Sequence, residues 1–433
     1  MSPITRLARA SVAAVVFALV AAACSSGGDS STSSPSAGAS GSATAPSGEI
    51  TFLVSSTPTV DNLIKMIPDF TAQTGITVNV ADIDYDAMTQ KETLDLRSKT
   101  GQYDVFWVEG TFLPRYVGQL NGLEPLQDYA SSQGIDLATS DMSSTLVDNF
   151  SVDGKLYAMP FENTLMMSAV RNDLYEQANL TPATTLPEYL SNVQALNDPP
   201  TVYGTEIMGQ QGEPIFYEWV NWLWGEGGDL FDTAGAPTLN TPEAIKATED
   251  LITLSKSAPP GVANYSWDQA ATSFATGQVS TAVLFSDQTP GLLDPSNSKV
   301  IDKWSYVPFP GDKPTAFGGY AWAMNASSQN KPAALAFIQW ATSAEVSKQL
   351  VPDGSSPPQT SVQTDPALQS KYPWLKAEAE ASSRAIVPIK NTAYFDLVDA
   401  LSTDLNAALT GSMTPDEAMA DAQSKWEDIL AAQ

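Results

Sequence analysis

The stretch that decides the fold is residues 49–108, EITFLVSSTPTVDNLIKMIPDFTAQTGITVNVADIDYDAMTQKETLDLRSKTGQYDVFWV. Its first segment, Glu49–Ser55, alternates in polarity like a strand, and apolar residues then recur at helical spacing until Gly75 ends that helix. Ile76–Ala81 and Tyr103–Val108 are again strand-like. With a second helix between these two strands, the pattern predicts right-handed parallel βαβ units.

The ends of these strands are the place to look for a site, because ligands of open α/β sheets bind at the carboxyl ends of the strands. The second helix spans Tyr85–Ser98, with Asp84 or Asp86 as its cap. Tyr85 and Asp84 therefore follow the second strand, where we expect Tyr85 to be the ligand contact. Glu109 follows the third strand. Polar groups at several strand ends predict a cleft.

Helical patterns predominate farther along the chain, and two strand-like segments interrupt them, Ser280–Phe285 and Tyr320–Met324. The helices are expected at Pro187–Ala195, Pro214–Trp224, Pro242–Lys256, Trp267–Ala275, Pro332–Leu350, Asp396–Leu409 and Pro415–Leu430. The chain shows no internal repeat.

Composition excludes several classes of function. The chain of 433 residues carries 49 acidic and 21 basic side chains, a net charge of −28, and it has no sustained basic patch. Nucleic acid is therefore not an expected partner, and neutral ligands fit this charge best. No histidine is present, which excludes a Ser-His-Asp triad and a His-ligated metal. The single cysteine, Cys24, excludes an intramolecular disulfide and a cysteine metal cluster.

No metal and no cofactor are predicted. Asp82, Asp84 and Asp86 imitate the start of a calcium loop, but Ala87 occupies the position of the required glycine, and Thr93 that of the bidentate glutamate. The sequence also lacks a phosphate-binding GxxxxGK[ST] motif, so ATP hydrolysis would fall to a partner protein.

The N-terminal residues indicate the compartment. Arg6 and Arg9 precede the apolar run Ala10–Val20, which is too short to span a membrane and has the proportions of a signal peptide. Small residues before Cys24 resemble a bacterial lipobox, although Ala21 replaces the preferred leucine. We therefore expect a lipoprotein signal peptide over residues 1–23 and lipidation of Cys24, with ordinary cleavage as the alternative. Residues 24–48, rich in Ser, Gly, Ala and Pro, are expected to form a disordered tether.

The chain resembles the extracellular solute-binding proteins of carbohydrate ABC importers, the maltose-binding-protein type (solute-binding family 1). The resemblance covers residues 49–433 and is carried by an ordered set of segments, namely TGITVNVADIDYDA, GQYDVFWVEGTFLPRYV, LNGLEPLQDY, VDGKLYAMPFENTLMMSAVRNDLYEQANL, YEWVNWLWGEGGDLFD, PTLNTPEAIKA, FATGQVSTAVLFSD, FGGYAWAMNASSQNKPAALAFIQWATSAEVSKQL and DGSSPPQTSV. It implies an α/β, two-lobed periplasmic-binding-protein fold of type II, with a mainly parallel sheet in each lobe and a ligand trapped in the cleft between them by hinge closure. The N-terminal lobe is expected at 49–160 and 286–344, and the C-terminal lobe at 161–285 and 345–433.

The resemblance also implies most of the ligand-binding residues. Glu109 stands where the family often places an acidic contact, and Glu162 and Asn163 stand where the chain first crosses between the lobes. Asp287 ends the strand that resembles the second crossing, with capping of the next turn as its alternative role. Arg384 lies where related proteins place an arginine that reaches into the cleft.

Glycine and aromatic residues complete the predicted site. Gly318, Gly319 and Tyr320 match the family's glycine pair, which lets backbone N–H groups approach a ligand. Sugars need flat apolar faces against their C–H surfaces. Trp219, beside polar neighbours on its helix, is the expected platform, with core packing as the alternative.

The predicted function is the substrate-binding subunit of an ABC importer for a mono- to trisaccharide or a polyol. It would be a monomer on the outer face of the cytoplasmic membrane, delivering ligand to a permease and its ATPase without catalysis. Three alternatives stay open at this point. They are a secreted carbohydrate-active enzyme using a carboxylate pair such as Glu109 and Glu162, a surface adhesin or structural lipoprotein, and a binding protein for a glycerol-derived solute.

Overall fold

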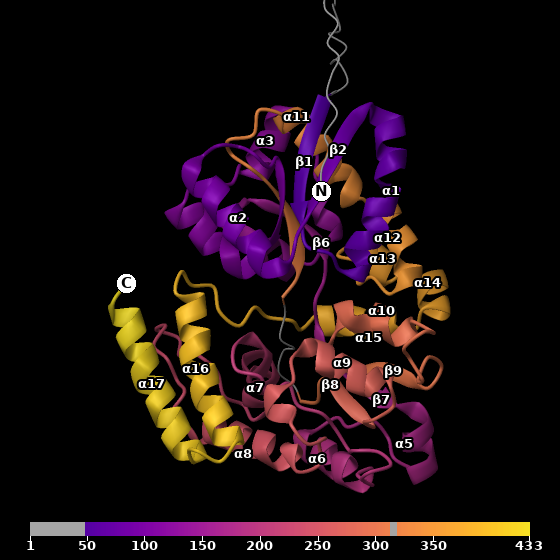
Figure 1. Cartoon of the computed structure of the whole chain (residues 1–433), viewed down its shortest axis with the longest axis vertical. Helices are drawn as coiled ribbons and strands as arrows, with labels where there is room; N and C mark the ends of the chain where they lie inside the picture. The colour runs from indigo at the N-terminus through magenta and orange to yellow at the C-terminus, as the bar shows by residue number, and fades with distance from the viewer. Residues whose placement is uncertain (1–47, 312–317) are drawn as a thin grey trace, which may run out of the picture. The chain divides into compact units, whose positions relative to one another are not determined.

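Five strands form the first sheet of the computed structural model, which describes residues 48–311 and 318–433 (Figure 1). Their order across the sheet is β2-β1-β3-β10-β6. β1 pairs in parallel with β2 and β3, whereas β10 pairs antiparallel with β3 and β6. The strands are β1 (Gly48–Val54), β2 (Ile76–Asp82), β3 (Val105–Glu109), β6 (Ala158–Glu162) and β10 (Tyr320–Met324). The predicted signal peptide, the tether up to residue 47 and the lipidation site Cys24 lie outside the described residues.

Local sequence explains the first βαβ unit. The hydroxyl of Thr57 caps α1 (Pro58–Thr74) by accepting from the backbone N–H of Val60, and Gly75 ends the helix at φ 74°, a conformation that favours glycine. The helix buries its apolar stripe against the sheet. α2 (Tyr85–Ser98) then leads to β3. The predicted order of strands and helices over residues 49–108 is therefore confirmed.

The second sheet has three strands in the order β8-β7-β9, which are β7 (Met166–Arg171), β8 (Thr281–Phe285) and β9 (Trp304–Pro308). β7 pairs antiparallel with both neighbours. The expectation of a mainly parallel sheet in the second lobe is therefore wrong. Strands buried on both faces read as apolar runs whatever their direction, so their sequence does not reveal the orientation of their neighbours.

The strand pairing also corrects the predicted lobe boundaries. Because β9 belongs to the second sheet, the return to the first lobe comes between β9 and β10, not at residue 286. The first crossing follows Glu162 at the end of β6. Gln359 forms a bridge with Met142, so the first lobe also continues beyond the predicted boundary at 344.

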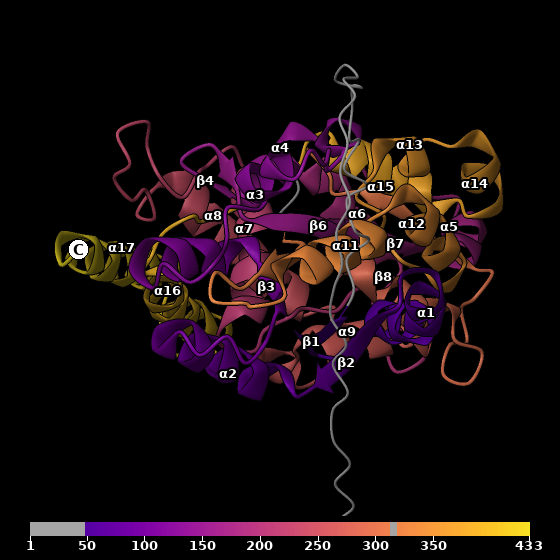
Figure 2. The ribbon, with the colours of Figure 1, turned by 90° about the horizontal axis from the view of Figure 1, so that it is seen from above.

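Helices surround both sheets, as Figures 1 and 2 show. They are α3 (Leu126–Ser132), α4 (Ser144–Asn149), α5 (Asn172–Ala178), α6 (Leu186–Ala195), α7 (Glu213–Gly225), α8 (Pro242–Ser255), α9 (Trp267–Ala275), α10 (Thr289–Leu293), α11 (Lys331–Ala341), α12 (Ala344–Leu350), α13 (Thr360–Gln363), α14 (Pro366–Lys371), α15 (Trp374–Ser382), α16 (Tyr394–Leu409) and α17 (Pro415–Ala431). The helix predicted over 332–350 is divided into α11 and α12, because the hydroxyl of Ser343 caps a new helix start by accepting from Val346 N–H. In the described part of the chain, no helix combines the length and apolarity needed to cross a membrane.

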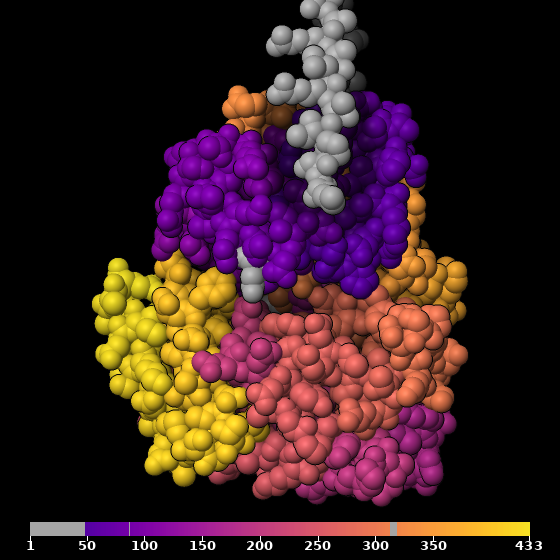
Figure 3. All heavy atoms as spheres, in the orientation of Figure 1, coloured from indigo at the N-terminus to yellow at the C-terminus, as the bar shows by residue number. Residues whose placement is uncertain are grey.

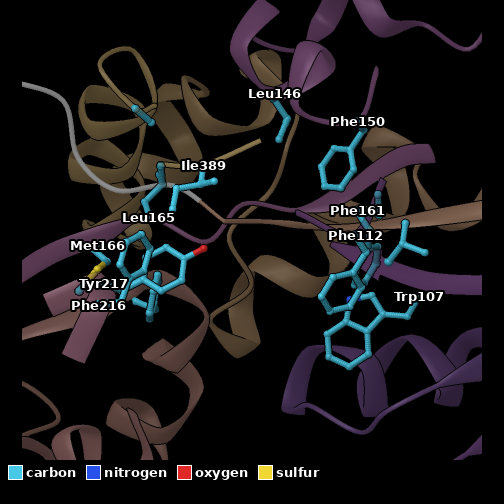
Figure 4. Packing of buried hydrophobic residues seen from close by; sticks show 14 of the residues in the cluster. Trp107, Phe112, Leu146, Phe150, Phe161, Leu165, Met166, Phe216, Tyr217 and Ile389 are labelled. Carbon is cyan, nitrogen blue, oxygen red and sulfur yellow. The ribbon is translucent and has the colours of Figure 1, made fainter. Parts of the chain in front are cut away.

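One large cluster of buried apolar side chains extends through both lobes. In the close view of Figure 4, Trp107 and Phe112 lie on the side of the first sheet, and Phe216 and Tyr217 on the side of the second. Three segments connect the lobes: the link from β6 to β7, the link from β9 to β10, and the chain after α12. These links place the carboxyl end of β3 and the start of β10 opposite the residues that follow β8.

Candidate ligand-binding site

A cavity of about 780 Å³ lies between the two lobes. The first lobe lines it with residues at the ends of its strands, chiefly Ser55, Ser56, Tyr85, Trp107, Glu109, Gly318, Gly319 and Tyr320. The second lobe contributes Glu213, Tyr217, Trp267, Asp268, Phe285, Asp287 and Gln288. Thr164, on the crossing from β6 to β7, completes the wall. The structure thus brings together the predicted residues Tyr85, Glu109, Asp287, Gly318, Gly319 and Tyr320.

Three of the four carboxylates in the described cavity wall, those of Glu109, Asp287 and Glu213, are each fixed by a tyrosine. The hydroxyl of Tyr85 donates to Glu109 Oε1 over 2.6 Å, and that of Tyr320 donates to Asp287 Oδ2 over 2.9 Å. The hydroxyl of Tyr394, at the start of α16, donates to Glu213 Oε1 over 2.5 Å. A tyrosine that occupies one oxygen orients the carboxylate and leaves acceptor capacity for a ligand.

The cavity is rich in acids, and the residues described along its wall include no lysine or arginine. Burial raises the pKa of Glu109 to about 8, and the negative charge of Glu213 adds to this effect while the bond from Tyr85 opposes it. Burial also raises the pKa of Asp287 to about 6, again opposed by its tyrosine partner. Such a wall offers acceptors to a ligand with many O–H or N–H donors, and its described residues supply no cation to pair with an anion.

Aromatic side chains on both sides of the cavity supply flat apolar surface. Trp107 in β3 meets the ring of Tyr320 edge-on, with ring centroids 4.5 Å apart, and it contacts the ring of Tyr85 at 6.0 Å. In the second lobe, Phe285 packs between Tyr217 at 5.3 Å and Trp267 at 5.9 Å. These rings can cover the C–H faces of a ligand while the carboxylates bind its hydroxyls.

The predicted contacts Glu162 and Asn163 lie at the first crossing but do not line the cavity. Both are fully buried. Glu162 Oε1 accepts from Thr59 Oγ1 over 2.9 Å and from the backbone N–H of Ser356 over 3.2 Å, and Asn163 Nδ2 donates to the carbonyl of Pro357 over 3.0 Å. Their side chains tie the crossing to residues 356–357, because irregular buried backbone needs polar partners.

Trp219 and Arg384 also lie away from the cavity wall. Trp219 is 0% exposed, and its indole N–H donates to Thr248 Oγ1 over 2.9 Å in the core between α7 and α8. The predicted platform role for Trp219 is corrected on this ground, and core packing is its role. Arg384 Nη1 donates to the backbone carbonyl of Gly311 over 3.1 Å and does not reach the wall of this cavity.

Sequence reasoning missed several residues of the wall. Trp107 follows the strand-end rule, since it lies two residues before Glu109 at the carboxyl end of β3. Trp267 begins α9 immediately after its cap Ser266, so a helix start was the available signal. Glu213 precedes the proline that opens α7, and no sequence signal placed it beside Glu109.

Two lobes joined by crossing segments, with an acidic and aromatic cavity between them, define a binding protein of the hinged, two-lobed class. The chain belongs to the family of bacterial extracellular solute-binding proteins, whose model matches residues 55–348. The predicted two-lobed class is thereby confirmed. No cluster of side chains suited to a metal ion occurs among the described residues.

Known proteins similar to this chain are binding proteins as well. A mannitol-binding protein of Pseudomonas aeruginosa is 29% identical over 384 residues, covering 79% of this chain and 83% of the relative. A probable amino-acid ABC transporter periplasmic-binding protein of Sinorhizobium fredii is 27% identical over 378 residues, covering 84% of each chain. An ABC transporter solute-binding protein of Agrobacterium radiobacter, solved in complex with ribitol, is 28% identical with a TM-score of 0.79, covering 89% of this chain and 99% of that one.

Proposed function

We propose that this protein is the substrate-binding subunit of an ABC importer and that it captures a linear polyol or a small sugar. The observation that carries the proposal is the set of tyrosine-held carboxylates in one cavity, with no basic side chain among the described residues of its wall. Hydroxyl groups donate to such acceptors without bringing charge. The names of the mannitol-binding and ribitol-bound relatives support the polyol class.

An amino acid is the second ligand class to consider, because one relative bears that name. Its ammonium group would suit Glu109 and Asp287. Its α-carboxylate, however, would enter an acidic cavity in which no described residue of the wall supplies a cation. The same lack of a cation in the described wall disfavours glycerol-derived solutes that carry a phosphodiester group. A neutral polyol avoids this cost.

Capture without bond cleavage is part of the proposal. The carboxylate pair considered for an enzyme, Glu109 and Glu162, does not share the cavity, because Glu162 is buried at the crossing. Reversible binding of ribitol or mannitol with unchanged ligand recovered after release supports the binding role. Cleaved or modified sugar recovered from a disaccharide incubation would contradict it.

The experiment is calorimetric titration of the purified protein with ribitol, D-mannitol, maltose, glycerophosphocholine and an L-amino acid. We expect binding of one neutral polyol or sugar, with no binding of the phosphodiester. Asp287→Asn should weaken this binding about tenfold, because an amide is a poorer acceptor than a carboxylate. The matched control is Asp153→Asn, which changes an exposed turn residue at φ 51° that asparagine also tolerates. Equal loss in both variants would contradict a specific role of Asp287.

The proposal includes an extracytoplasmic location with a lipid anchor on Cys24, delivery to a permease, and a monomeric state. It is supported by the lipobox-like residues before Cys24 and by the extracellular family. Cys24→Ser should release the protein from the membrane fraction into the soluble fraction, since several acyl chains are needed for stable anchoring. Ser25→Ala, as the control, should leave it in the membrane fraction. A protein that stays in the membrane without Cys24 would contradict lipidation there.

A further inference from the structure

A second cavity, of about 400 Å³, lies at another point of the boundary between the lobes. The first lobe lines it with residues of α2 and of the short helices η1 (Gly110–Phe112) and η2 (Pro114–Gln119). The second lobe contributes Thr392, Tyr394 and Phe395 at the start of α16. Figure 3 shows this contact zone where the yellow atoms of the C-terminal segment meet the indigo-to-violet atoms of the first lobe.

The charge of this cavity is opposite to that of the ligand cavity. Arg97 and Arg115 line it, and its described wall contains no aspartate or glutamate. Within residues 48–311 and 318–433, neither arginine takes part in an ion pair. Two positive side chains that line one cavity, with no acidic side chain in its described wall, repel each other, and an anion between them would relieve this repulsion.

A buried hydroxyl in the same wall points independently to a ligand. Thr111 is 6% exposed, and its Oγ1 has no hydrogen-bond partner in the described part of the protein. Buried polar atoms are rarely left without a partner, so an unpaired hydroxyl in a cavity wall indicates a polar occupant. Glu92, which is not among the described wall residues, accepts from the hydroxyl of the wall residue Tyr116 over 2.9 Å. Burial raises the pKa of Glu92 well above its usual range, so this group does not neutralise the arginines.

We infer that this second cavity is an oxyanion site, with a donor set that suits a phosphate or sulfate group. Arg97 and Arg115 would supply N–H donors in the planar fork that suits oxyanions, and the hydroxyl of Thr111 would supply a further donor. Such an occupant differs in class from the ligand of the first cavity, whose acidic wall disfavours anions.

The two cavities share one side chain. Tyr394 lines the anion cavity, and its hydroxyl donates to Glu213 in the wall of the ligand cavity. The anion cavity also needs both lobes, since Phe112 of η1 meets Phe395 of α16 with ring centroids 5.7 Å apart. An anion bound there favours this arrangement of the lobes, and thereby the ligand cavity. This coupling rests on the proposed function, whereas anion binding itself does not.

The first test is titration of the purified protein with inorganic phosphate at constant ionic strength, with sulfate and acetate in parallel. We expect saturable binding of phosphate or sulfate and about tenfold weaker binding for each of Arg97→Gln and Arg115→Gln. Lys91→Gln is the matched control, because it removes one positive charge from an exposed position of the same helix α2 outside the cavity. Its phosphate affinity should stay unchanged.

Two results would overturn the site. One is the absence of saturable phosphate and sulfate binding to the wild-type protein. The other is an equal rise in melting temperature with phosphate in the wild type and in the Arg97→Gln/Arg115→Gln variant, which would indicate general stabilisation by an excluded salt. A rise limited to the wild type and Lys91→Gln supports the site.

The second test measures the coupling. Saturating phosphate should tighten ribitol or mannitol binding about fivefold in the wild type, and the double arginine variant should lose this effect. By reciprocity, the polyol should tighten phosphate binding by the same factor. If phosphate binds but the affinity for the polyol stays unchanged, the coupling between the two cavities is overturned, whereas the anion site stands. Phosphate binding to a protein that binds no polyol or sugar would instead contradict the proposed function and leave the anion site standing.

Discussion

The hydroxyl of Tyr320 donates a hydrogen bond of 2.9 Å to Asp287 Oδ2 across the ligand cavity. Tyr320 begins β10 in the first sheet, whereas Asp287 follows β8 of the second. The bonds from Tyr85 to Glu109 and from Tyr394 to Glu213 each stay within one lobe. The Tyr320–Asp287 bond therefore links the two lobes directly at the point where a ligand would bind.

Removing this hydroxyl with Tyr320→Phe should weaken polyol binding about tenfold, or about 1.4 kcal/mol, because a hydrogen bond to a charged acceptor is lost while the ring remains. Burial and the charge of Asp287 raise the pKa of Tyr320, so the hydroxyl stays a donor at neutral pH. Calorimetry with ribitol and mannitol measures the change. Tyr129→Phe, outside the cavity, should bind as the wild type does, and equal affinities of both variants would count against the link.

Substitutions of Trp219 and Trp267 distinguish a tryptophan that packs in the core from one that contacts the ligand. Trp219→Ala should cost about 3–5 kcal/mol of unfolding free energy, because it opens a cavity in a fully buried core, while the folded fraction keeps its affinity. Trp267→Ala should have the opposite profile, with weaker binding and a small loss of stability, because Trp267 is half-buried in the cavity wall. Denaturant unfolding and calorimetry on both variants give the comparison. A binding defect in Trp219→Ala without loss of stability would contradict its core placement.

These two residues show where sequence reasoning reaches its limit. The helix α7 is buried on every side from Pro214 to Trp224, so its apolar pattern carries no information about which face meets a ligand. Trp219 could not be told from a platform residue by spacing. Trp267 lies on a different helix, and only tertiary packing brings it to Phe285.

The first lobe was easier to predict, because its strands alternate with helices and the strand-end rule is local. That rule gave Tyr85 and Glu109, which the structure joins by a hydrogen bond. The antiparallel pairing of β7 with β8 and β9 depends on contacts between segments more than a hundred residues apart, such as Met166 with Phe285. The resemblance to a family supplied Asp287 and Tyr320, which local pattern alone did not connect.

Acids buried at the crossing predict a stability that falls as pH rises. Burial raises the pKa of Glu162 to about 8 in the folded protein, whereas an unfolded glutamate titrates near ~4.3. Between these values the folded state holds a proton that the unfolded state has lost, so the free energy of unfolding decreases with increasing pH. The contribution of Glu162 is fully present below about pH 4.3 and is lost as pH rises through about 8.

The substitution Glu162→Gln tests this prediction, because glutamine keeps an acceptor for Thr59 and does not titrate. The free energy of unfolding of Glu162→Gln is measured with urea at pH 5, 6, 7 and 8. Its slope against pH should be shallower than that of the wild type by up to about 1.4 kcal/mol per pH unit. The exposed Glu176→Gln should keep the wild-type slope. Parallel curves for Glu162→Gln and the wild type would mean that Glu162 is ionised in the folded protein.

The two strand-linking crossings meet at Gly318 and Thr164. The backbone N–H of Gly318 donates to the carbonyl of Thr164, 2.9 Å away, and both residues line the ligand cavity. A Cβ on Gly318 would lie 2.5 Å from Thr164 Oγ1 but 3.8 Å from Thr164 Cβ. Gly318→Ala therefore forces the crossings apart, unless the threonine hydroxyl is removed.

We expect Gly318→Ala to lower the unfolding free energy by about 1–3 kcal/mol, the usual cost of overpacking, and to weaken polyol binding by displacing a cavity wall. Adding Thr164→Ala should restore most of the stability, because the remaining contact of 3.8 Å is an ordinary van der Waals distance. Thermal unfolding and calorimetry of the wild type, both single variants and the double variant complete a double-mutant cycle. A double variant as unstable as the sum of the single losses would show that the two crossings do not meet at this contact.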